Sequence, residues 1–485
     1  MEYDLNKDVK GQTKARNRVL NSKAFIFSMF NVANFIEYFN LQSLPSSMRA
    51  LEISLGLSPV DISNFATAES LGLVGFIPVW GALSDKVELK YIMLVGVALS
   101  GIISIILGGI SNYSFILFLR VLNGAMMGSV TPSSQKYIVT QLSNHFGIGF
   151  GVMHSVMCAA RLASSITVTT YSTVKYGGIM GWRYCLYIFG AVSLALSPIV
   201  LLIPNLNPKS NEQSVEHITI KTRAYNFVYY LYRMFKESLS NATSILMVFL
   251  NFFSDGPFVA FSFVTLLLQY MGLSNTKSGL TVGIVIIGGI AGGVLGGFVS
   301  DYFNKKSPKY GLILFGNLNV IIRVLTFCIA FFWVNFDNVN KLFPLLAVSL
   351  FINGMTFMTV SCVDRTLLAN VVPKTFQSSA ISIIRCLSGV AGAVIFNRLL
   401  AYIREFGFGY EQTSLDVKDM PIELMRKNAD ALRYSISIVS LVCTGVVFII
   451  YNILCFTYWR DCKRIQKIEA ESPIVNPIEA LEEVV

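Results

Sequence analysis

Charged residues are scarce in this chain. Asp, Glu, Lys and Arg together make up 14% of its 485 residues, whereas soluble domains carry about 25%. Histidine occurs only three times, which leaves little for zinc or haem ligation. The eight cysteines include no CxxC pair, so we expect neither a metal site nor a disulfide framework. The sequence also lacks a Walker-type phosphate loop, so direct use of ATP through such a loop is excluded.

Long apolar runs dominate instead. Hydrophobic residues make up 54% of the chain, and the mean hydropathy is +0.60. A helix needs about 20 apolar residues to cross the hydrocarbon of a bilayer, and twelve runs are long enough. We place these predicted spans near 24–46, 60–83, 91–111, 114–139, 147–172, 183–203, 242–271, 277–300, 310–334, 343–370, 376–402 and 432–458.

Lys and Arg gather in alternate connecting segments. The polar, basic segment 1–23 shows no signal-peptide core, and its charge predicts a cytosolic N-terminus. Twelve spans then place both termini in the cytosol, with the membrane of residence left open. The expected organisation is a tail at 1–23, a six-helix bundle at 24–203, a cytosolic linker at 204–241, a second bundle at 242–459 and a tail at 460–485.

A short motif occurs once in each half of the chain. Gly81 and Asp85, followed by Lys86, end the second run, and Gly297 and Asp301 recur 216 positions later at the end of the eighth. Glycine allows two helices to approach closely, and an Asp at a helix end can pair with a helix N-terminus or a basic residue. We therefore expect a latch on the cytosolic side, although Asp and Lys could simply mark a solvated boundary.

These features together resemble the major facilitator superfamily. The motif after spans two and eight, the central linker, the stretch 120–124 (Arg-Val-Leu-Asn-Gly) and Gly181-Trp182-Arg183 all fit it. The N-terminal half is also similar, more loosely, to the spinster-type branch. Span five lacks the Gly-Pro motif of the superfamily's drug antiporters. The resemblance implies an all-α membrane protein with two pseudo-symmetric six-helix bundles, which we expect to be a monomer.

Ionisable residues inside spans are costly and often functional. Glu37 lies near the middle of the first span with Asn34 on nearly the same face, and Asp255 follows Asn251 in the seventh. If the halves are pseudo-symmetric, the two acids face one cavity and could hold a proton or a cation. The alternative is a set of structural ion pairs, such as Glu37 with Arg161.

The remaining charged candidates divide into two groups. Arg161 could bind an anionic group of a substrate, and Glu69 and Arg385 are weaker candidates for contact with the substrate or a coupling ion. Arg323 has no predicted partner. The residues expected to act in gating, besides the two motif copies, are Arg120, Asp364 and Arg365.

The sequence therefore predicts a secondary active or facilitative transporter that moves a small organic solute by alternating access, with coupling to protons as one option. The alternatives are a lipid or lysolipid transporter of spinster type and a non-transporting membrane receptor. No enzyme is expected, because three histidines support no Ser/His/Asp or metal cluster. We also expect no cofactor and no nucleic-acid partner, because the basic residues belong to short segments beside the membrane.

Overall fold

The computed structural model describes residues 22–57, 59–142, 145–204, 229–230, 232–334, 336, 338–373, 376–391, 395–411 and 420–471. Most of the predicted N-terminal tail, most of the predicted linker and the end of the C-terminal tail lie outside these residues. The chain divides into two compact units. Unit 1 comprises Met1–Ser143 and Ala163–Met234, and unit 2 comprises Asn144–Leu162 and Phe235–Val485.

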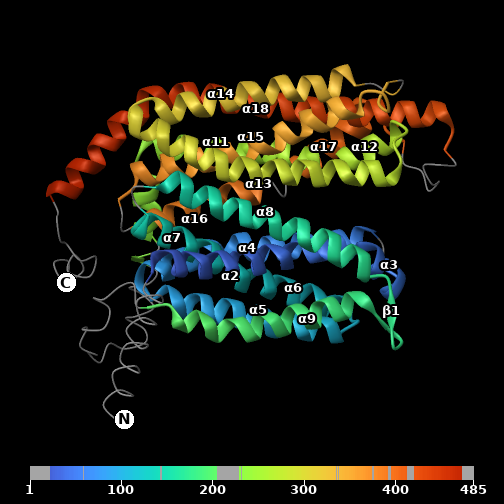
Figure 1. Cartoon of the computed structure of the whole chain (residues 1–485), viewed down its shortest axis with the longest axis horizontal. Helices are drawn as coiled ribbons and strands as arrows, with labels where there is room; N and C mark the ends of the chain where they lie inside the picture. The colour runs from blue at the N-terminus through green and yellow to red at the C-terminus, as the bar shows by residue number, and fades with distance from the viewer. Residues whose placement is uncertain are drawn as a thin grey trace, which may run out of the picture. The chain divides into compact units, whose positions relative to one another are not determined.

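Unit 1 is built from long helices and one small hairpin (Figure 1). The Gly177–Gly178 turn of this hairpin has φ values of 56° and 84°, which suit a two-residue hairpin loop. The α8 helix begins in unit 2 and ends in unit 1. The elements are α2 (Lys23–Ser46), α3 (Met48–Leu55), α4 (Pro59–Lys86), α5 (Leu89–Gly109), α6 (Tyr113–Met127), α7 (Val130–Gln141), α8 (Phe146–Tyr171), β1 (Lys175–Tyr176), β2 (Ile179–Met180), α9 (Gly181–Leu196) and the 3₁₀ helix η1 (Ser197–Leu202).

Unit 2 contains the start of α8 and a second series of helices. Its last helix, α18, contains 50 residues and is about 75 Å long at 1.5 Å per residue. The elements are α11 (Ala242–Phe261), α12 (Val264–Tyr270), α13 (Asn275–Lys306), α14 (Gly311–Cys328), the π-helix η3 (Ile329–Trp333), α15 (Phe343–Val371), α16 (Gln377–Ala391), α17 (Asn397–Tyr402), the π-helix η5 (Ile403–Gly407) and α18 (Ile422–Glu471).

Ten helices in the described part of the chain are long and apolar enough to cross a membrane, and the predicted all-α membrane fold is confirmed. The two other predicted spans are helical but less regular. The α2 helix is 24 residues long but carries Asn31, Asn34, Glu37 and Asn40. The eleventh span is divided between α16 and α17, with 392–394 outside the described residues.

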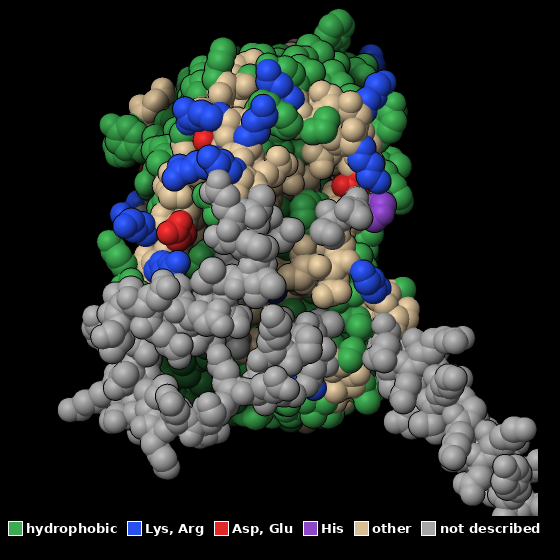
Figure 2. Space-filling model, turned by 90° about the vertical axis from the view of Figure 1, so that its left-hand side faces the viewer, with side chains coloured by type: hydrophobic (Ala, Val, Ile, Leu, Met, Phe, Trp, Pro, Cys, Tyr) green, Lys and Arg blue, Asp and Glu red, His purple; other side chains and the backbone are tan. Residues whose placement is uncertain are grey.

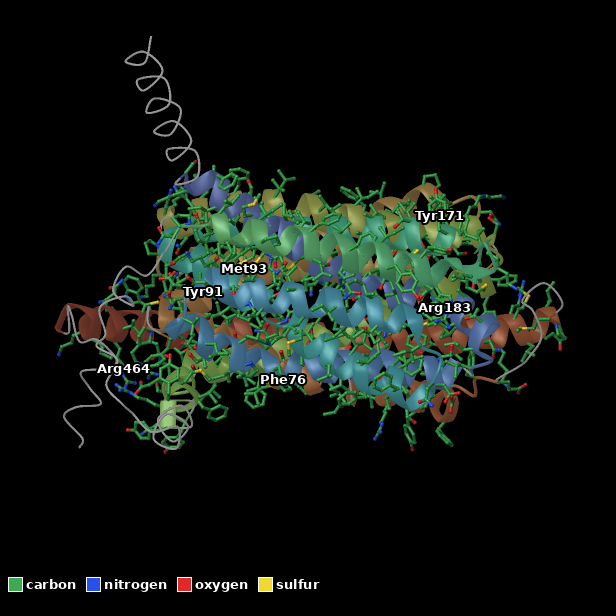
Figure 3. All side chains as sticks on the ribbon, turned by 90° about the horizontal axis from the view of Figure 1, so that it is seen from below. Phe76, Tyr91, Met93, Tyr171, Arg183 and Arg464 are labelled. Atoms are coloured by element: carbon green, nitrogen blue, oxygen red, sulfur yellow. The ribbon has the colours of Figure 1, made fainter. Side chains whose placement is uncertain are left out.

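The surface of the helices has the pattern expected in lipid. On α5, Tyr91 is 48% exposed while Met93 is fully buried, and Phe76 on α4 is also exposed (Figure 3). Lys and Arg side chains instead gather on the face at which α13 and α18 end (Figure 2). This is the face that the sequence predicts to be cytosolic.

The repeat seen in the sequence extends to the packing of the helices. In both units a glycine on each of two neighbouring helices meets the backbone of the other helix so closely that a Cβ would collide with a carbonyl oxygen. On the first helix the matched residues are 216 positions apart, and on the second 230. The matched contacts are Gly72–Val121 and Gly124–Glu69 between α4 and α6, and Gly288–Phe351 and Gly354–Val285 between α13 and α15. Such close approach is typical of membrane helices that pack through small residues.

Candidate functional site

Polar side chains join α2 to α7 inside unit 1. Asn34 donates a hydrogen bond from Nδ2 to Ser134 Oγ at 2.7 Å. One turn further along α2, Glu37 accepts from Thr131 Oγ1, with distances of 3.1 and 3.0 Å to its two oxygens. Glu37 is 1% exposed. The structure thus places this predicted coupling residue in a tight contact between two helices.

A second buried network joins α4, α5 and α6. Arg120 Nη1 lies 3.2 Å from Glu69 Oε2, and Asn123 Nδ2 donates to Glu69 Oε1 at 2.8 Å. Ser100 Oγ in turn donates to Asn123 Oδ1 at 3.0 Å. The side chains of the ion pair are only 4% and 3% exposed. Sequence reasoning separated Glu69, as a substrate candidate, from Arg120, as a gating candidate, whereas the structure pairs them.

The counterpart of the α2 pair lies on α11 in unit 2. Asn251 Nδ2 donates to Met247 O at 2.8 Å, as Asn34 Nδ2 does to Phe30 O. Asp255 differs from Glu37, because it is only half-buried and makes no hydrogen bond within the described part of the chain. The charge of Arg385 acts on its carboxylate. Asp255 is therefore the less constrained of the two acids.

Three arginines on three helices exert their charge on one histidine in unit 2. The charges of Arg365 on α15, Arg385 on α16 and Arg161 on α8 all act on buried His154. The His154 ring also lies 3.7 Å from Cys362, measured from Nδ1 to Sγ. The three arginines are half-buried, so their charge is partly removed from water. We call Arg161, Arg365 and Arg385 the arginine group.

The arginine group contains residues for which the sequence predicted two different roles. Arg161 was expected at an anionic ligand, and its guanidinium lies 5.6 Å from the ring centre of Phe258. Arg365 was expected at a gate; its charge acts on the same histidine as those of Arg161 and Arg385, and its part in gating remains a prediction. The three charges act on His154, and nothing in the sequence indicates that role, because α8 is far from α15 and α16 in the chain.

The second copy of the repeated motif lies at the N-terminus of α8. Asp301 accepts hydrogen bonds from the backbone N–H groups of Gly147 at 2.7 Å and Ile148 at 3.0 Å. A carboxylate at this end complements the helix dipole. At Gly297 a Cβ would collide with the backbone of Gly147, so the glycine permits the contact that brings Asp301 into place.

The first copy of the motif is described less fully. Gly81 is buried on α4, and its carbonyl accepts a hydrogen bond from Ser84 Oγ at 2.7 Å. The side chains of Asp85 and Lys86 lie outside what the structure describes. Their expected part in a latch therefore remains a prediction.

Asp364, another predicted gating residue, is buried within unit 2. Tyr451 donates a hydrogen bond to Asp364 Oδ1 at 2.5 Å. Arg323, which had no predicted partner, donates from Nη2 to Thr356 O at 3.1 Å and lies over the ring of Phe357 at 4.3 Å. Within the described residues, no cluster of three or more His, Cys, Asp or Glu could hold a metal ion.

A sequence profile of the Major Facilitator Superfamily matches residues 30–396. An uncharacterised transporter of Buchnera aphidicola is 24% identical over 61% of the chain and 67% of its own length. The benzoate transport protein of Acinetobacter baylyi is 23% identical over 56% of the chain and 63% of its own length. A probable galactarate/D-glucarate transporter of Escherichia coli is 20% identical over 77% of the chain and 85% of its own length.

Solved structures share the fold at low sequence identity. The transporter FucP in an outward conformation has a TM-score of 0.58 at 13% identity and covers 89% of the chain and 98% of its own. A bacterial homologue of the lysosomal transporter Spinster, in an inward-facing conformation, has a TM-score of 0.54 at 14% identity. The match covers 90% of the chain and 98% of the homologue. These likenesses concern the arrangement of helices alone.

Proposed function

Since the chain belongs to the Major Facilitator Superfamily, we propose that it moves a small organic anion across a membrane by alternating access. The observation that carries this proposal is the arginine group around His154 in unit 2. A carboxylate substrate could accept charge-assisted hydrogen bonds from guanidinium groups, which are suited to planar, bidentate recognition.

The charge of this region supports an anionic ligand. The three arginines are half-buried, and the described acids on which their charges act include Asp255, through Arg385, and Asp364, through Arg365. Positive charge inside a membrane protein is costly unless it is compensated, and a bound anion would supply part of that compensation. The names of two relatives point in the same direction, because benzoate and the galactarate/D-glucarate pair are carboxylates.

Asp255 is the proposed coupling group. Its carboxylate is half-buried, makes no hydrogen bond in the described part of unit 2 and feels the charge of Arg385. When Asp255 is ionised it competes with an anionic substrate for Arg385, and protonation ends that competition. Proton binding and anion binding would then favour each other, which is the linkage required for symport.

Proteoliposomes provide the test of this function. We expect the protein to accumulate carboxylates from a labelled panel that includes benzoate and galactarate, more strongly when the lumen is alkaline. Asp255→Asn should abolish gradient-driven accumulation while it preserves exchange of the same solute across the membrane, because the arginine group is unchanged.

The matched control is Glu37→Gln, since a Gln oxygen can still accept the hydrogen bond from Thr131. We expect this variant to retain coupling. Loss of accumulation in Glu37→Gln but not in Asp255→Asn would show that the coupling group is in unit 1. Movement of labelled lysolipid instead of carboxylates would favour the spinster-type alternative, and binding without flux would favour a receptor.

Asp301 is proposed to act as a latch at the start of α8, a contact that must break if this end of the helix moves away from α13. Asp301→Asn should weaken the cap, because a neutral amide complements the helix dipole less well. Hydrogen–deuterium exchange of a peptide that covers 146–152 should then be faster than in the wild type. Asp430→Asn is the control, because Asp430 pairs with Arg433 on the same helix, α18. An unchanged exchange rate in Asp301→Asn would contradict the latch.

A further inference from the structure

A narrow cavity lies among α11, α14, α15 and α18, within unit 2. Its volume is about 10 Å³, which is room for about one water-sized species. Phe261 and Phe357 supply part of its apolar wall, and Arg323, Asn353, Ser440 and Thr444 supply its polar wall. No member of the arginine group lines it, so its walls do not include the proposed transport site.

Three buried polar atoms on the residues of this wall lack hydrogen-bond partners within the described chain. They are Arg323 Nη1, Asn353 Oδ1 and Ser440 Oγ. Their residues are 3%, 0% and 2% exposed. A buried polar group that makes no hydrogen bond costs about 1–3 kcal/mol, so three of them around one cavity indicate that a polar ligand belongs there.

The charge of Arg323 is also incompletely balanced. Its Nε and Nη2 donate only to the hydroxyl and carbonyl oxygens of Thr356, and no described carboxylate lies within ion-pair distance of it. Asp364 interacts with Arg323 over a longer range, but it also interacts with Arg365 and is hydrogen-bonded by Tyr451. Asp364 therefore does not form a dedicated ion pair with the buried Arg323.

We propose that this cavity is a binding site for a small inorganic monovalent anion such as chloride. The anion would accept hydrogen bonds from Arg323 Nη1 and from the hydroxyl groups of Ser440 and Thr444, and it would balance the guanidinium. The positive edges of phenylalanine rings also suit an anion. The anion does not satisfy Asn353 Oδ1, because that oxygen is itself an acceptor. A water molecule in place of the anion would satisfy it but would supply no charge. The bound ion would link α14 to α18. Its binding would not require the transported solute.

Thermal unfolding of the purified full-length protein tests this site. In a titration of chloride against gluconate at constant ionic strength, the wild-type Tm should rise by several degrees and then saturate, because a ligand that binds only the folded state stabilises it. Ser440→Ala/Thr444→Val should weaken the chloride dependence at least tenfold, and Arg323→Gln should remove it.

Ser437→Ala is the matched control, because Ser437 lies on the same helix and its buried hydroxyl also lacks a partner but does not line the cavity. It should keep the chloride response of the wild type. Crystals soaked in bromide should show anomalous density beside Arg323. Equal wild-type Tm values in both salts, a chloride response that survives in Arg323→Gln, or water alone beside Arg323 would overturn the proposal.

Discussion

Replacing Arg120 with glutamine should destabilise the folded protein by about 3–5 kcal/mol, because removal of one partner from a buried ion pair leaves an uncompensated charge. Glu69 and Arg120 are almost completely buried, and they contact each other at 3.2 Å. Among the described residues, Asn123 would still donate a hydrogen bond to Glu69 in this variant. An uncharged amide cannot neutralise the carboxylate. A lower Tm and a smaller yield of monodisperse protein in detergent should report the loss.

The double variant Glu69→Gln/Arg120→Gln provides the control. It removes both charges and keeps groups that can form hydrogen bonds, so it should recover most of the lost stability. A double variant as unstable as Arg120→Gln would mean that shape rather than charge determines the effect. A single variant with wild-type Tm would show that the pair does not stabilise the contacts among α4, α5 and α6.

Removal of charge from the arginine group should have the largest effect on transport. A hydrogen bond to a charged group contributes about 1.5–3 kcal/mol, which corresponds to roughly 10- to 100-fold in affinity. We therefore expect Arg161→Gln and Arg385→Gln each to raise the KM for a transported carboxylate by roughly this factor. Uptake into proteoliposomes over a range of solute concentrations measures it.

Three further variants make this result specific. Arg433→Gln removes an arginine of unit 2 that pairs with Asp430 and lies outside the arginine group, so it should leave the KM unchanged. Lysine at 161 or 385 keeps the positive charge and should restore part of the affinity. Wild-type KM values in Arg161→Gln and Arg385→Gln would contradict a role of these two arginines in binding.

The fold was predictable because its signals are local or repeated. Twelve apolar runs, alternating basic segments and two copies of one motif require no knowledge of which helices touch. The repeat even anticipates the contacts of Gly124 and Gly354, since equivalent positions make equivalent backbone contacts. The length of α18 departs from the prediction, because Ile422–Asp430 and Arg460–Glu471 continue the helix where the composition indicated polar segments outside the span.

The site was less predictable because its pairings depend on packing between distant segments. Glu69 is 51 positions from Arg120, and Asp364 is 87 positions from Tyr451. The sequence indicates that such residues lie within apolar spans, where a charge is costly. It does not indicate which of them contact each other. A tyrosine among many aromatic residues gives no signal of its own, so the partner of Asp364 became visible only in the structure.

Uptake of a matched pair of solutes is the most direct test of the central proposal that the arginine group of unit 2 binds the charge of an organic anion. Galactarate and galactitol share a hydroxylated six-carbon chain and differ in their carboxylates. In proteoliposomes with the wild-type protein, labelled galactarate should enter well above the rate in protein-free vesicles, and labelled galactitol should not. Equal uptake of both solutes, or uptake of galactitol alone, would contradict the account.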